Sequence, residues 1–208
     1  MFDIPLIKQH NDNTCGAACI NMLNISRSAK IEEKKIFEKI SGKTYLGNIC
    51  QTSLMLKYFL DHGYQTCVAC VKNPKKVLKI CSQNSINVIM LIRHNKYSSF
   101  GHYVVYMGIE EDSVYVNDPA RTKLRRLSVK KLKKLAKSSF LTGVTESNTM
   151  IFVNMDTSNK MDEVVISDFD RWENVKVCAT IFACIKKYVK KVFICEDNGE
   201  RWHKVKQN

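Results

Sequence analysis

A change of hydrophobic period near the middle of the chain most constrains the fold. Before it, most apolar residues recur at helical spacing. After it come three strand-length apolar segments, "INVIMLIR" (86–93), "GHYVVYMGI" (101–109) and "SVYVNDP" (113–119). The last two are separated only by the short polar turn 110–112, so they are expected to pair as consecutive antiparallel strands. Helices followed by an antiparallel sheet predict an α+β domain.

The other elements follow from periodicity and from turn residues. We expect helices over 15–24, 29–40, 48–63 and from 73–74 through 81, a strand in 64–71, a helix near 128–137 and a strand over 149–154. A polar link at 155–163 then divides a domain, 1–155, from a C-terminal extension, 156–208. In the extension, apolar residues from Val177 to Val192 share one helical face and lysines the other, which predicts a basic amphipathic helix. This helix either packs on the domain or contacts a membrane surface or a partner.

Charge and hydropathy limit the classes of function. The chain of 208 residues carries a formal net charge of +13, and nine basic but no acidic residues lie in 121–137. Such a run is a solvated face or attracts an acidic protein or an anionic membrane; no motif points to nucleic acid. Neither a membrane-spanning run nor a secretory signal is present, so we expect a soluble protein, cytoplasmic or exported without a classical signal peptide into a host or target cell.

The nine cysteines do not suggest a disulfide framework, because they are odd in number and scattered through apolar segments. Most are expected to be small core residues. Cys67 and Cys70 form a CxxC, but no second CxxC or histidine pair completes a zinc site. The sequence therefore predicts neither a metal nor a cofactor.

The segment "KQHNDNTCGAAC" (8–19) carries the first candidate for chemistry, Cys15. Thr14 is placed to cap a helix that begins at Cys15, and both a helix N-terminus and a nearby imidazolium favour a thiolate. Gly16 is expected to leave the flank of this thiol open to substrate. A core cysteine would not explain the polar residues that precede it.

A histidine, an aspartate and a glutamine complete the candidate site. His102 follows Gly101 at the head of a predicted strand and is a candidate general base. If the next strand forms a hairpin with it, Asp118 lies beside His102 and can orient the ring, with Asn117 as the next candidate. Gln9, upstream of Cys15, can supply one donor of an oxyanion hole.

These motifs together resemble the C39-like branch of the papain-like cysteine peptidases, which includes the leader-removing domains of bacteriocin exporters and free-standing relatives. The resemblance spans about residues 4–154, through "IPLIKQHNDNTCGAACINML", "YLGNICQTSLMLKYFLDHGYQT" and "GHYVVYMGIEEDSVYVNDPA". It implies a papain-like fold, with N-terminal helices packed on the sheet and the extension as a helical appendage. It also implies that Gln9, Cys15, His102 and Asp118 are oxyanion residue, nucleophile, base and orienter, with Gly16 and Gly101 at the substrate cleft.

Three functions remain open on this basis. The first is hydrolysis of a peptide bond in a protein or peptide substrate, an acidic one if the basic run contributes, through a thioester acyl-enzyme. The second uses the same groups on a glutamine side chain, as a deamidase or transglutaminase of the kind found in bacterial effectors or toxins. The third is a non-catalytic peptide-binding module. The basic extension and the absence of exporter segments argue against the usual double-glycine leader as substrate.

Overall fold

The computed structural model describes residues 1–29, 31–44, 47–94, 100–136, 147–155, 163–164, 177–196 and 199–204. The helices are α1 (Cys15–Ile25), α2 (Glu33–Ile40), α3 (Thr52–Asp61), α4 (Pro74–Gln83), α5 (Val129–Leu135) and α6 (Ala179–Ile185), with a 3₁₀ turn at Lys186–Tyr188. The strands are β1 (Ser41–Thr44), β2 (Gly47–Cys50), β3 (Gln65–Val71), β4 (Asn87–Arg93), β5 (Gly101–Glu110), β6 (Ser113–Asn117), β7 (Arg125–Ser128), β8 (Thr149–Asn154), β9 (Glu163–Val164), β10 (Val177–Cys178), β11 (Val189–Glu196) and β12 (Gly199–Lys204).

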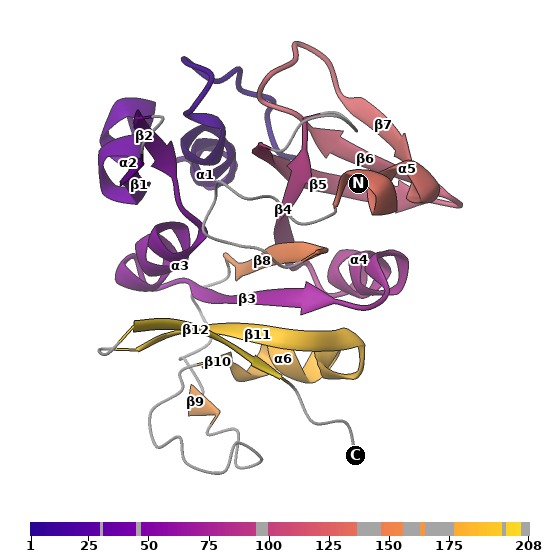
Figure 1. Ribbon diagram of the computed structural model, residues 1–208. Helices are drawn as coiled ribbons and strands as arrows, with labels where there is room; N and C mark the ends of the chain where they lie inside the picture. The colour runs from indigo at the N-terminus through magenta and orange to yellow at the C-terminus, as the bar shows by residue number, and fades with distance from the viewer. Residues whose placement is uncertain are drawn as a thin grey trace.

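An eight-stranded sheet in the order β12-β11-β3-β8-β4-β5-β6-β7 forms the centre of the molecule (Figure 1). Its neighbouring strands are all antiparallel. The three central segments of the sequence form β4, β5 and β6 as predicted, and β5 and β6 are joined as the expected hairpin. Strand β8 returns from later in the chain and lies between β3 and β4.

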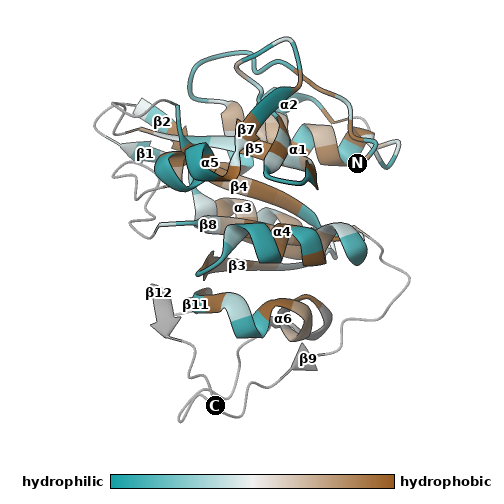
Figure 2. Ribbon diagram, turned by 90° about the vertical axis from the view of Figure 1, so that its right-hand side faces the viewer, coloured by the Kyte–Doolittle hydropathy of each residue, from teal (hydrophilic) through white to brown (hydrophobic). Residues whose placement is uncertain are grey.

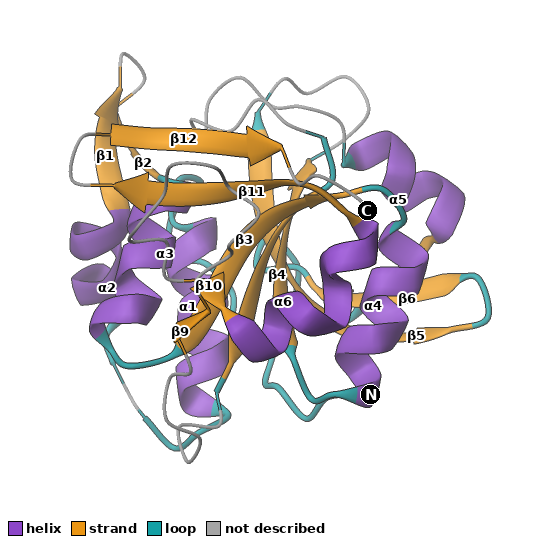
Figure 3. Ribbon diagram, turned by 90° about the horizontal axis from the view of Figure 1, so that it is seen from below, coloured by secondary structure: helices purple, strands orange, loops and turns teal. Residues whose placement is uncertain are grey.

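Helices cover both faces of this sheet. Along β5, Tyr103 and Val105 point into the core beneath α1, α2 and α3, while Val104 and Tyr106 point into the core that α4, α5 and α6 line. This alternation follows from the two-residue period of a strand. Figure 3 shows the two helical groups on opposite sides of the strands. The predicted α+β architecture, with N-terminal helices packed on an antiparallel sheet, is confirmed, and the second helical layer adds to it.

Helix α1 is unusually apolar, and all of its residues from Cys15 to Asn24 are buried. It packs against α2 and β5, and small residues such as Ala17 and Ala18 are fully enclosed. A helix that is apolar all round belongs inside a protein rather than on its surface. Its burial places its first residue, Cys15, next to the strand that carries His102.

The helix predicted over 48–63 is shorter in the structure. Residues Gly47–Cys50 form strand β2, which pairs with β1, and α3 begins only at Thr52. Gly47 has a positive φ of 96°, a conformation that favours glycine and allows the tight reversal between these strands. The hairpin brings Cys50 to the start of α1, a contact that the sequence analysis does not anticipate.

The C-terminal extension also departs from the prediction. The helix expected across 177–192 is limited to α6, and Val189 and Val192 lie on strand β11, which pairs with β3. Ile181 and Ile185 of α6 are fully buried, so this apolar face packs inside the protein rather than on a membrane. The predicted linker residues 156–162 lie outside the described residues. Among the helices of the described ranges, none is long and apolar enough to cross a bilayer.

Candidate active site

Three side chains from separate parts of the chain form one line of contacts. His102 Nε2 lies 2.7 Å from Asp118 Oδ1, and the His102 ring also forms a hydrogen bond with the Cys15 thiol. Because Nε2 is engaged by the carboxylate, Nδ1 is the ring nitrogen that remains for the thiol. Cys15 is 7% exposed, His102 5% and Asp118 fully buried. The predicted hairpin, together with α1 packed on β5, therefore brings these residues together.

The charges in this line favour an imidazolium. Burial lowers the pKa of His102, but the hydrogen bonds to Asp118 and Cys15 and their charges outweigh it and raise the pKa to about 9. Burial raises the pKa of Asp118, yet hydrogen bonds from His102 and Arg125 and the charge of His102 hold it well below its usual range. A buried, ionised carboxylate that binds Nε2–H fixes the ring orientation and its tautomer.

The start of α1 is held differently from the prediction. Thr14 stands at the N-cap, but its hydroxyl bonds to the backbone of Asn11 and does not cap the helix. Cys50 lies against this turn instead: its thiol donates to Asn13 O at 3.3 Å, and the backbone N–H groups of Ala17 and Gly16 act to lower its pKa. Burial, followed by the charge of the neighbouring Cys15, raises the pKa of Cys50. Cys50 is therefore a neutral thiol that packs against the first turn of α1.

Gly16 has a packing role that differs from the expected open flank. The residue is buried, and a Cβ at this position would lie 2.8 Å from Cys50 Cβ and 3.0 Å from Met55 Sδ. Glycine therefore permits the close approach of β2 and α3 to the first turn of α1. Gly101 begins β5 opposite Arg93 and is half-buried, directly before His102.

Gln9 is tied to the loop that carries Asp118. Its backbone N–H donates to Pro119 O at 2.9 Å, while the Asn117 side chain donates to Ile4 O at 2.8 Å. Asn117, the second candidate orienter, is thus engaged by the N-terminal segment rather than by His102. The Gln9 side-chain Nε2 donates to Asn11 O at 2.8 Å, and its Oε1 is buried without a partner among the described residues. A primary amide has a second N–H available to another acceptor.

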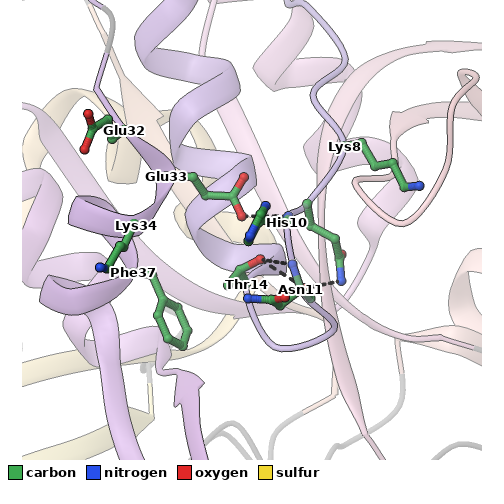
Figure 4. A pocket seen from close by; sticks show the side chains of 9 residues that line it. Lys8, His10, Asn11, Thr14, Glu32, Glu33, Lys34 and Phe37 are labelled. Atoms are coloured by element: carbon green, nitrogen blue, oxygen red, sulfur yellow. Dashed lines mark hydrogen bonds between the residues drawn. The ribbon is translucent and has the colours of Figure 1, made fainter.

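A groove of about 820 Å³ lies beside the start of α1, between the 8–14 loop and α2 (Figure 4). Its lining is mixed in charge: Lys8, Gln9, His10, Asn11, Thr14, Glu32, Glu33, Lys34 and Phe37. The Glu33 side chain reaches from α2 toward the loop and accepts the backbone N–H of His10 at 2.9 Å. The groove therefore runs along the loop from Lys8 to Thr14 that leads to Cys15, while neither Cys15 nor His102 is among its lining residues.

Two residues near the site have no role in the sequence analysis. His94, just after β4, packs edge-on against His102 with 5.3 Å between ring centroids, and burial together with the His102 charge lowers its pKa. The register of the two strands could have revealed it, because Ile92 pairs with His102 and His94, two residues further along the chain, points to the same face of the sheet. Arg125 donates to Asp118 Oδ2 at 2.7 Å, although the sequence places it in a run that reads as surface.

The CxxC cysteines lie inside the sheet. Both Cys67 and Cys70 are on β3, where residues three apart point to opposite faces, and Cys70 Sγ donates to Ser147 O at 2.7 Å. In the ranges that the structure covers, no three His, Cys, Asp or Glu side chains are grouped so that they could hold a metal ion.

A cysteine at the start of a buried helix, facing a histidine on an antiparallel sheet, is the arrangement of the papain-like class. Within that class the chain belongs to the peptidase C39 family, whose sequence model matches residues 3–148, well over half of the chain. Membership supports a cysteine peptidase, a hydrolase, at the level of the family. A search of curated protein sequences gave no match.

Solved structures agree with this fold. One is a double-glycine-motif protease from an AMS/PCAT transporter in complex with a leader peptide: 19% identity, TM-score 0.51, covering 73% of this chain and 91% of that one. A C39-like protein from Bacillus anthracis has 15% identity and a TM-score of 0.55, covering 73% and 94%. The peptidase domain of Streptococcus ComA, a bifunctional ABC transporter, has 15% identity and a TM-score of 0.53, covering 71% and 96%.

Proposed function

We propose that the protein hydrolyses a peptide bond of a protein or peptide substrate, with Cys15 as nucleophile and His102 as general base and acid. The observation that carries this proposal is the contact line from Asp118 through His102 to Cys15. A structural cysteine gains nothing from an imidazole whose other nitrogen is held by a fully buried carboxylate. A nucleophile gains a proton acceptor of fixed orientation.

Each step follows from these contacts. His102 Nδ1 takes the thiol proton, and the Cys15 sulfur attacks the carbonyl carbon to form a tetrahedral oxyanion. The Cys15 backbone N–H, which has no partner within the helix at its first turn, and the second N–H of Gln9 stabilise that oxyanion. The imidazolium protonates the leaving amine, which leaves a thioester. Water, deprotonated by His102, attacks the thioester and releases the acid and the Cys15 thiol.

The groove in Figure 4 is our candidate for the substrate channel, because it follows the chain from Gln9 to Thr14, the residue that directly precedes Cys15. A peptide ligand accords with the leader peptide bound to the transporter protease. Gly101 is a second candidate for the wall of the cleft, since it lies beside His102 and has no side chain.

A peptide library derived from a digested proteome tests this proposal. The full chain, incubated with the library, should create new peptide termini that mass spectrometry detects, and Cys15→Ala should create none. Cys81→Ala is the matched control, because Cys81 is equally buried but lies on the opposite side of the sheet. New termini that persist in Cys15→Ala would overturn the assignment. Conversion of glutamine to glutamate without cleavage would identify a deamidase. If the peptides were neither cleaved nor deamidated, the protein would be a binding module.

A further inference from the structure

The basic run 121–137 is not a single surface in the folded protein. The lysines of α5, such as Lys130 and Lys133, are exposed, and Figure 2 shows this helix mostly in the hydrophilic colour. The Arg125 side chain is only 10% exposed. It begins strand β7, where it is paired with Val116 of β6, two residues before Asp118. Arg125 of the basic run therefore lies inside the site, because it is on the edge strand β7.

The two oxygens of Asp118 have separate partners. Oδ1 faces His102 Nε2 at 2.7 Å and accepts the backbone N–H of Ala120 at 3.1 Å. Oδ2 accepts Arg125 Nη1 at 2.7 Å, and Arg121 Nε lies 3.3 Å away. A carboxylate held on both oxygens has a fixed plane, so the direction of Oδ1 toward the imidazole depends on what holds Oδ2.

We propose that Arg125 is a positioning residue that acts through Asp118: it keeps this carboxylate ionised and oriented toward His102 throughout the catalytic cycle. This inference rests on the function proposed above. His102 loses its positive charge each time it gives its proton to a leaving group, and at that moment it no longer balances the buried carboxylate. A guanidinium is not deprotonated in proteins, so Arg125 balances Asp118 in both halves of the cycle.

Arg121 differs from Arg125 although it approaches the same oxygen. Its side chain is 53% exposed, so water screens its charge and competes for its N–H groups. The Arg125 guanidinium is almost fully enclosed and makes the shorter contact. Arg121→Met is therefore a matched control that removes a cation from the same carboxylate at an exposed position.

Other charged groups around Asp118 define what a titration can detect. Besides His102 and the two arginines that contact it, the groups whose pKa its charge affects are His94 and Cys19. We therefore choose a background of Cys15→Ala for spectroscopy, which removes the thiol nearest to His102. In this background, a titration step of the His102 ring at acid pH reports protonation of Asp118.

The experiment compares Arg125→Met, Arg125→Lys and Arg121→Met with the unmodified chain. For Arg125→Met we expect kcat on a cleaved peptide to fall about 10–100-fold, the range for loss of one hydrogen bond to a buried charge, with little change in KM. The acid limb of the pH profile should move to higher pH, because Asp118 then accepts a proton more readily. Arg125→Lys should restore part of kcat, and Arg121→Met should change kcat much less.

Two further measurements keep the test decisive. The kcat of Arg125→Met/Asp118→Asn should be no lower than that of Asp118→Asn alone, because both substitutions act on one contact. If the losses in kcat of the two single variants multiply in the double variant, the proposal is overturned. The double variant also avoids a buried unpaired carboxylate if Arg125→Met folds poorly. Nuclear magnetic resonance of the His102 ring should show the acid titration step at higher pH in Cys15→Ala/Arg125→Met than in Cys15→Ala alone. If this titration step stays at the same pH, the proposal for Arg125 is overturned, whether or not the protein cleaves a peptide. Absence of peptide cleavage by the unmodified chain is a separate outcome, and it would refute the proposed function.

Discussion

Asp118→Asn is the substitution that best separates the charge of the candidate orienter from its shape. The pKa of His102 is about 9 against an ordinary 6.5, an interval that corresponds to about 3 kcal/mol in favour of the imidazolium. Asp118 and Cys15 share this interaction, whereas burial of the ring opposes it. An asparagine keeps the volume and removes the charge, so it removes up to about 3 kcal/mol. We therefore expect kcat/KM to fall by up to about 10²–10³-fold.

The assay combines kinetics with a histidine titration. In the Cys15→Ala background, Asp118→Asn should lower the pKa of His102 below its value with Asp118 present, since the burial that opposes the charged ring remains. A ring that titrates at the same pH with and without the Asp118 charge would refute this reasoning. So would an Asp118→Asn enzyme with undiminished kcat/KM, since the thiolate–imidazolium pair would then not depend on the carboxylate.

The same shifts make stability depend on pH. A raised His102 pKa contributes stability that is complete below the unfolded value of about 6.5 and is lost as the pH rises through about 9. A lowered Asp118 pKa contributes stability that is present above its unfolded value and is lost as the pH falls. The difference in unfolding free energy between the unmodified chain and Asp118→Asn, measured with urea, should therefore shrink from pH 6.5 to pH 9. A constant difference over that range would contradict the coupling.

Three other substitutions test the surroundings of the site. Gly16→Ala should destabilise the fold by about 1–3 kcal/mol in urea unfolding, because its Cβ would overlap Cys50; an unchanged midpoint would show that the first turn of α1 has room. Cys50→Ala should lower the midpoint and slow alkylation of Cys15 through loosening of that turn, whereas Cys81→Ala should affect only stability. Lys130→Glu/Lys133→Glu should weaken cleavage of acidic peptides at low salt and spare neutral ones, while equal effects on both would remove the basic surface from substrate selection.

The strands that build the site were predictable because each is set by local pattern. The alternation in 101–109, the turn at 110–112 and the following strand define a hairpin, and that hairpin places Asp118 near His102 without any tertiary information. The helix that begins at Cys15 was predictable for the same reason. The packing of this helix against β5, which brings Cys15 to His102, could not be read from local pattern. Only the order of glutamine, cysteine, histidine and aspartate along the chain suggested that the two residues meet.

The missed features all depend on contacts between distant segments. Cys50 lies against the first turn of α1 only because an unforeseen hairpin, β1–β2, brings it there. The spacing of Val189 and Val192 fits one face of a helix, yet both lie on β11, where an irregularity in the pairing with β3 between Val189 and Lys191 lets both pack into the same core. Arg125 reads as one of nine surface cations until Asp118, a buried charge on the neighbouring strand end, gives it a partner.

Alkylation of Cys15 is the measurement that tests the central claim most directly. The full chain and His102→Ala are treated with a limiting amount of iodoacetamide at several values between about pH 5 and 9, and peptide mass spectrometry gives the rate at each cysteine. Our account predicts that Cys15 reacts first even at the acid end, ahead of the more exposed Cys184, and that peptidase activity disappears in step with its modification. In His102→Ala the advantage of Cys15 should be lost. A Cys15 that reacts no faster than Cys184, or equally fast without His102, would contradict the account.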